Sequence, residues 1–366
     1  MMKYVDEFRN FRLVEKVAQR ISAITPAKVI NIMEVCGTHT QNFYRFGLDK
    51  LLPKNINFIA GPGCPVCVSS QEYIDSAIKL TQNGDMIIAT FGDMLRVPGS
   101  SSSLEKEKAK FGNVRVVYSP LDALSIARAN PNKKIVFLGV GFETTAPTIA
   151  LSIMAARKEK LGNMFFLTSL KLIPPALKCL LMDKRLKLDG FLCPGHVSVI
   201  IGTNNYEFIP KRYKIACCVT GFEPLDLLGG ICKIIEQIVS KRPFVANQYT
   251  RVVTKAGNLK AQSIINKVFQ RANSRWRGLG VIPESGLQLK REFVQFDAAK
   301  FLPVSRASCK LKFAARCRCA DVLKGLIQPQ VCSLFRKICK PDNPVGPCMV
   351  SSEGACNAFY KFKRPR

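Results

Sequence analysis

Acidic residues, histidine and tryptophan are scarce in this chain, and long uninterrupted hydrophobic runs are missing. The most apolar long stretch, 163–182, is broken by Lys171 and by a pair of prolines, so we expect no membrane span. The first 21 residues alternate charged and apolar side chains at helical spacing and lack the apolar core and cleavage site of a signal peptide. We therefore expect a cytoplasmic protein, whose 15 cysteines serve metal and redox chemistry rather than structural disulfides.

The shortage of acidic residues leaves a large positive charge. The 366 residues include 55 Lys and Arg but 26 Asp and Glu, a formal net charge of +29. Such a charge suggests nucleic-acid binding. However, the basic residues are scattered and no aromatic-basic platform or nucleic-acid motif accompanies them. A solvated basic face, or a surface for an acidic protein partner, is the preferred interpretation.

Residues 1–240 alternate short apolar runs with amphipathic stretches, which predicts an α/β fold with parallel sheets covered by helices. We expect strands at 29–35, 56–60, 85–90, 114–118, 134–139, 164–168, 190–192 and 214–219. We expect helices at 6–22, 71–82, 121–129, 145–158, 175–182 and 224–240. A Gly-Phe-Glu triplet recurs at 141–143 and 221–223, each time between a strand and a helix, which favours two related α/β units. The predicted domains are 1–125, 126–240 and a basic, helix-poor, Cys-rich domain at 241–366.

The strongest chemical signal is a set of six cysteines in the last 50 residues. Zinc sites usually have paired CxxC motifs, and none occurs in this segment. Thiolates spread along a loop-rich chain suit an iron–sulfur cluster. We expect four of the six to ligate it, with Cys317, Cys332, Cys339 and Cys356 as the preferred set. Cys319 is an alternative to Cys317, and the remaining pair, Cys319 and Cys348, would form a dithiol beside the cluster.

A second group of thiols follows predicted strands near the N-terminus. Cys64 and Cys67 form a CxxC in a Gly-Pro-Gly turn, where a helix N-terminus would favour the thiolate. Either redox cycling or iron ligation is open to them. Cys36 ends the first predicted strand. Ligands gather at the carboxyl ends of parallel strands, so these three sulfurs are expected to meet.

Three polar residues occupy similar positions at strand ends. His39 lies three residues after Cys36, and His196 is the second of the two histidines in the chain. Glu143 stands at the start of a predicted helix, either as a capping acid or as a proton carrier. The neighbouring glycines match no dinucleotide-binding or Walker motif, so a nucleotide cofactor is not expected.

These motifs together resemble the HypD family of [NiFe]-hydrogenase maturation proteins. The resemblance runs through nearly the whole chain: EVCGTHT at 34–40, GPGCPVCV at 61–68, FGDMLRVPGS at 91–100, GFETTAPT at 141–148, PGHVS at 194–198, GFEPLDLL at 221–228, WRGLG at 276–280, IPESGL at 282–287, CRCADVLKG at 317–325 and PVGPCMVSSEGACNAFYKF at 344–362. The family fold would consist of two similar α/β domains facing across a cleft, plus a small C-terminal domain with a [4Fe-4S] cluster.

The resemblance also implies a function. Family members are scaffolds that hold iron together with a HypC-type chaperone while cyanide, from a HypE-type partner, and carbon monoxide are attached to form Fe(CN)₂CO. It implies that Cys36 holds the iron, that Cys64 and Cys67 lie beside it, and that Thr38, His39 and Glu143 are polar positions of the cleft. The CVSS sequence at 67–70 and the high positive charge depart from the family pattern. The alternative function is an iron–sulfur-dependent reductase of protein disulfides, which would leave Cys36 and His39 without a role.

Overall fold

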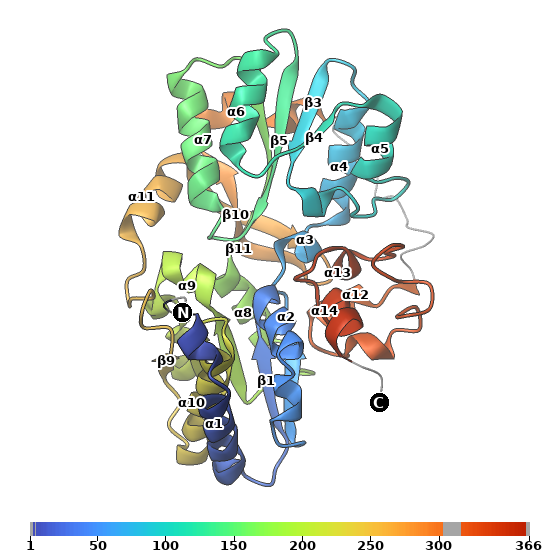
Figure 1. Ribbon diagram of the computed structural model, residues 1–366. Coiled ribbons are helices and arrows are strands. Elements are labelled where there is room, and N and C mark those ends of the chain that lie inside the picture. The colour runs from blue at the N-terminus through green and yellow to red at the C-terminus, as the bar shows by residue number, and fades with distance from the viewer. Residues whose placement is uncertain (1–2, 4, 303–315, 364–366) are drawn as a thin grey trace.

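The fold is built on two β-sheets with helices packed around them, and Figure 1 shows one sheet with its helices above the other. A computed structural model describes residues 3, 5–302 and 316–363. The first sheet has the strand order β2-β1-β7-β8-β9 and the second has β10-β11-β6-β5-β3-β4. No helix within the described ranges combines the length and the apolar character that a membrane span requires.

All strands of the first sheet run parallel. They are β1 (Ile30–Glu34), β2 (Ile56–Ala60), β7 (Gly190–Pro194), β8 (Ala216–Thr220) and β9 (Val245–Asn247). Strands β7 and β8 are buried along their whole length, as expected for central strands covered on both faces. The covering helices include α1 (Phe11–Ile24), α2 (Gly37–Arg45) and α10 (Pro224–Ser240).

The second sheet is mixed rather than parallel throughout. Strands β3 (Met86–Thr90), β4 (Val114–Val116), β5 (Lys134–Gly141) and β6 (Met164–Lys171) are parallel. An antiparallel hairpin of β10 (Phe269–Trp276) and β11 (Gly280–Leu289) extends this sheet beyond β6. Gly278 and Gly280, both with positive φ, make the hairpin turn, a conformation that glycine adopts without steric cost.

The eight strands expected from the sequence are all present, and the expected helices are found with shifts of a few residues. They correspond to α1, α4 (Gln71–Thr81), α6 (Pro120–Ala129), α7 (Ala146–Lys158), α8 (Ile173–Leu181) and α10. The sequence patterns did not predict α5 (Leu104–Phe111), α9 (Gly195–Ile201), α11 (Leu259–Val268) or the β10–β11 hairpin. The outer strand β10 is mostly exposed and polar, so its sequence carries no clear hydrophobic alternation.

The sheets cut across the division expected at residues 125 and 126. The first sheet takes strands from 30–60 and 190–247, and the second takes strands from 86–171 and 269–289. Each sheet thus contains strands from 1–125, from 126–240 and from the segment after 240. The chain crosses from one sheet to the other after β2, after β6 and after β9, and no composition change marks the first two crossings.

The C-terminal segment has little regular structure and packs against α2 and against the short helix that follows β2. It contains α12 (Cys319–Leu323), α13 (Pro347–Val350) and α14 (Ala355–Phe362). Helix α14 packs against α2, and α13 packs against α3 (Pro65–Val68), the short helix that carries the CxxC (Figure 1). The Cys-rich segment is therefore placed directly against both N-terminal cysteine motifs.

The second Gly-Phe-Glu triplet is held by a buried ion pair. Asp226 is fully buried, and its carboxylate accepts hydrogen bonds from the backbone N–H groups of Phe222 and Glu223. Arg251 donates to both oxygens of the same carboxylate, at 2.8 and 2.6 Å. A bidentate pair of this kind fixes the turn between β8 and α10.

We expect Asp226→Ala to lower the free energy of unfolding by about 3 to 5 kcal/mol, because it leaves a largely buried guanidinium without its partner. Asp122→Ala is the matched control. Asp122 caps the start of α6 in the same way but is exposed, so its loss should cost about 1 kcal/mol. Urea denaturation followed by circular dichroism measures both. Equal losses for the two variants would contradict the role given to the buried pair.

Candidate functional site

The loops that carry Cys36 and Cys64 are in direct backbone contact. Cys36 is the N-cap of α2, immediately after β1, and the N–H of Gly37 donates to the carbonyl of Gly63 at 3.0 Å. A Cβ atom at Gly63 would lie 2.3 Å from the backbone nitrogen of Cys36, a distance that no side chain could occupy. The absence of a side chain at position 63 therefore brings the next residue, Cys64, beside Cys36.

The CxxC forms a short helical turn at the meeting point of three parts of the fold. Cys64 is the N-cap of α3, and its sulfur accepts a hydrogen bond from the N–H of Cys67 at 3.2 Å. The two cysteines form a disulfide, with Cα atoms 5.2 Å apart. Helix α3 packs against β5 of the second sheet and against α13. The sulfur of Cys67 lies 3.7 Å from the carbonyl oxygen of Pro347, the residue before Cys348.

Two carboxyl groups flank Cys36, the buried Glu34 and the partly buried Glu353, and neither was expected from the sequence. Glu34 accepts a hydrogen bond from the N–H of Cys36 at 2.7 Å and another from the Thr40 hydroxyl. Glu353 accepts from the hydroxyl of Thr38 at 2.7 Å. Burial raises the pKa of Glu34 to about 8 and also raises the pKa of Glu353. Burial, with the nearby charge of Glu353, raises the pKa of Cys36 to about 12.

The two histidines share one aromatic neighbour. His39 is fully buried in α2, and burial lowers its pKa to about 3, so the ring is neutral. Its ring centroid lies 5.1 Å from that of Phe222, and His196 stacks on the same ring at 4.0 Å. Among the described residues neither nitrogen of His39 has a hydrogen-bond partner. His39 lies one helical turn after Cys36, at the carboxyl edge of the first sheet.

Glu143 lies at the end of β5, in the second sheet. One of its oxygens accepts the N–H of Ile173 at 2.9 Å, so the side chain caps α8 rather than the helix that follows it in sequence. The other oxygen is buried and has no hydrogen-bond partner in the described part of the chain. Burial raises the pKa of Glu143 to about 7. No contact between Glu143 and Cys36 is seen among these residues.

All six C-terminal cysteines line one small internal cavity: Cys317, Cys319, Cys332, Cys339, Cys348 and Cys356. Interactions with the thiols of Cys317 and Cys348 lower the pKa of Cys319. The thiol of Cys348 also interacts with that of Cys356. Segments separated by some 40 residues thus bring their sulfurs to one place.

The surroundings of this cavity fit a group bound through thiolates. The N–H of Val345 donates to the sulfur of Cys339 at 3.4 Å, and such hydrogen bonds stabilise a thiolate. A Cβ atom at Gly346 would lie 2.7 Å from the sulfur of Cys317, so only glycine leaves that sulfur room. No three Cys, His, Asp or Glu side chains among the described residues converge tightly enough to hold a single metal ion. A cluster does not need this, because each thiolate binds a different iron.

Comparisons with known proteins agree with the motif pattern. The HypD family model, described as "Hydrogenase formation hypA family", matches residues 12–363. The chain is 44% identical to hydrogenase maturation factor HypD of Escherichia coli K12 over 99% of both chains. It is 43% identical to the proteins of that name from Azotobacter vinelandii, covering 100% of this chain and 98% of the relative, and from Rhizobium leguminosarum bv. viciae, covering 100% and 97%. The chain belongs to the HypD family.

Of the two carboxyl groups beside Cys36, only Glu34 could have been identified from the sequence. Glu34 is a charged residue at the end of a strand that is apolar apart from Asn31, and a buried charge needs local partners. Glu353 lies within the cysteine-rich terminus, and its position near Thr38 could not be read from the sequence because 315 residues separate them. A position near Cys36 follows from the packing of α14 on α2.

We expect Glu353→Gln to lower the pKa of Cys36, since it removes a negative charge that disfavours the thiolate. At a fixed pH of about 9 the thiolate fraction should rise, and alkylation of Cys36 by iodoacetamide should quicken at least about threefold. Peptide-resolved mass spectrometry of anaerobically reduced protein measures the rate. Glu72→Gln removes an exposed carboxylate elsewhere and should leave Cys36 unchanged. A slower reaction in Glu353→Gln would contradict this electrostatic assignment.

Proposed function

We propose that this chain is a cytoplasmic scaffold and redox component in [NiFe]-hydrogenase maturation. Its cargo is iron, which Cys36 holds together with a HypC-type chaperone while cyanide from a HypE-type partner and carbon monoxide are attached to form Fe(CN)₂CO. The observation that carries the proposal is the backbone contact between the Cys36 loop and the CxxC turn. The names of the relatives, hydrogenase maturation factors, support the same pathway.

Cys36 suits the handling of such an iron. Iron that carries cyanide and carbon monoxide favours soft thiolate donors and a shielded position. Cys36 is 8% exposed and stands at a helix N-terminus, where the backbone N–H groups of Thr38 and His39 favour its negative form. The thiol of Cys36 would lose its proton on binding metal, and the positive charge of the metal would then compensate the negative charge that burial disfavours. His39 and Thr38 position the first turn of α2 through Phe222 and Glu353.

The Cys64–Cys67 turn contacts both the Cys36 loop and the C-terminal cysteine segment. Attaching cyanide carried on a partner's thiol requires electrons, and the Cys64–Cys67 disulfide is the nearest redox pair. Cys67 contacts the backbone of Pro347, and the next residue, Cys348, interacts with Cys319. Glu143, with one free buried oxygen, is proposed as a proton carrier on the second sheet.

For the C-terminal cavity we propose a [4Fe-4S] cluster held by Cys317, Cys332, Cys339 and Cys356, with Cys319 and Cys348 as an adjoining dithiol. A bound cluster would supply single electrons to this dithiol. The support is the convergence of all six sulfurs, together with the direct interaction of Cys319 with Cys348.

We expect Cys339→Ser to abolish most of the visible absorbance and iron content of anaerobically purified protein, because it removes a cluster ligand. Cys232→Ser is the control, since Cys232 is a buried thiol on α10 outside the cavity. Iron analysis and absorbance spectroscopy measure both variants. Full absorbance in Cys339→Ser would remove this residue from the ligand set.

We expect the complex of this protein with its chaperone to show cyanide and carbonyl infrared bands that vanish in Cys36→Ala. Cys179→Ala, a partly exposed thiol outside both groups, should retain them. Infrared spectroscopy of the iron-replete, anaerobically prepared complex is the measurement. Absence of the bands from the unsubstituted complex would instead favour the disulfide-reductase function.

A further inference from the structure

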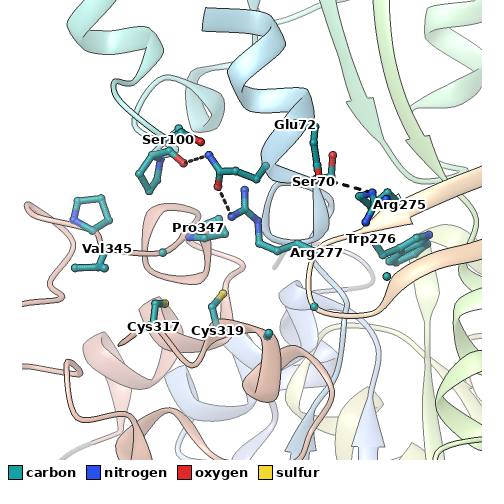
Figure 2. A pocket seen from close by; sticks show the side chains of 18 of the residues that line it. Ser70, Glu72, Ser100, Arg275, Trp276, Arg277, Cys317, Cys319, Val345 and Pro347 are labelled. Atoms are coloured by element: carbon teal, nitrogen blue, oxygen red, sulfur yellow. Dashed lines mark hydrogen bonds and ion pairs between the residues drawn. The ribbon is translucent and has the colours of Figure 1, made fainter. Parts of the chain in front are cut away.

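A second cavity adjoins the C-terminal cysteines and is not used by the proposed function. It encloses about 570 Å³, within the range of small-molecule sites, and lies between the second sheet and the Cys-rich segment (Figure 2). Its walls come from two motifs without an assigned role, FGDMLRVPGS through residues 98–100 and WRGLG through Trp276, Arg277 and Gly278. Cys317 and Cys319 line the opposite wall.

Arg277 gives this cavity an unsatisfied positive group. Its Nε donates to the carbonyl of Ser69 at 2.9 Å and its Nη1 donates to the side chain of Gln71 at 2.8 Å. Its Nη2 is buried and has no hydrogen-bond partner among the described residues. A buried donor without a partner is destabilising, and more so when it is charged, so an anionic ligand would be favoured here.

Arg277 is better suited than Arg275 to bind an anion in this cavity. Arg275 is half-exposed and lies 3.7 Å from the carboxylate of Glu72, so its charge is already paired (Figure 2). Arg277, by contrast, has no carboxylate within ion-pair distance in the described ranges, and it lines the same cavity as Cys319. The site therefore combines one free guanidinium edge with a nearby thiol.

We propose that this cavity binds a small thiol that bears a carboxylate, with the carboxylate on Arg277 and the sulfur directed at Cys319. The inference rests on the proposed function, in which Cys319 and Cys348 form a dithiol outside the cluster. Cys319 lines the cavity and Cys348 does not, which makes Cys319 the accessible member of the pair.

The ligand would return the dithiol to its reduced form by two exchanges. The thiolate of the first molecule attacks the sulfur of Cys319, the Cys319–Cys348 bond breaks, and Cys348 leaves as a thiolate that takes up a proton. A second molecule then attacks the outer sulfur of the mixed disulfide and releases Cys319. Two small thiols are oxidised to one disulfide, and one protein disulfide is reduced to two thiols.

The anion site is tested with two alkylating agents of nearly equal size, iodoacetate and iodoacetamide, on cluster-containing protein. The ratio of their rates at Cys319 should exceed the same ratio at Cys36. In Arg277→Gln the ratio at Cys319 should fall about tenfold, while Arg277→Lys should retain part of it and Arg275→Gln should leave it unchanged. A purely structural role for Arg277 would alter both reagents alike, and an unaltered ratio would overturn the proposal.

The thiol step is tested with mercaptoacetate and 2-mercaptoethanol on protein oxidised by diamide. Mercaptoacetate should reduce the Cys319–Cys348 disulfide faster, and Arg277→Gln should remove the difference between the two thiols. Equal selectivity in both proteins, or no reaction of Cys319 in either experiment, would overturn the inference. Cluster absorbance in the same samples shows separately whether the proposed cluster is present, so failure of one idea is distinguished from failure of the other.

Discussion

The site depends on one close backbone approach, that of Gly63 onto Cys36. Two loops from neighbouring parallel strands meet there with no room for a side chain, and this contact sets the positions of the sulfurs that follow. The helices α2 and α3 then begin on either side of the contact. A parallel pair of strands is well suited to this arrangement, because both loops leave the sheet at the same edge.

Burial governs the chemistry of the groups around this contact. Cys36 and Glu34 are buried and Glu353 is partly buried, and desolvation is the largest cause of the raised pKa of each. Neutral forms are therefore favoured until a cation arrives to compensate the negative charge. Binding of the proposed iron would release protons from these groups, which would couple metal binding to pH.

The C-terminal segment gains its structure from what it contacts rather than from its own secondary structure. Its helices are short, and its six cysteines line one cavity. Because α13 packs on α3 and α14 packs on α2, the Cys-rich segment is in contact with both N-terminal cysteine motifs. The same packing creates the Arg277 cavity at the border with the second sheet.

The sequence by itself determined the α/β class, eight strands, the cysteine motifs and the family, because alternating apolar runs and short cysteine spacings are local properties. It did not determine which strands share a sheet, since strand order depends on packing between distant segments. The hairpin that makes the second sheet mixed was hidden by the polar outer face of β10. Glu353 lies near the Cys36 loop from 317 residues away in the chain, and Arg277 and Cys319 line one cavity although they lie in different segments. Tertiary structure alone decided these contacts, because burial and charge act through space and leave no trace in local spacing.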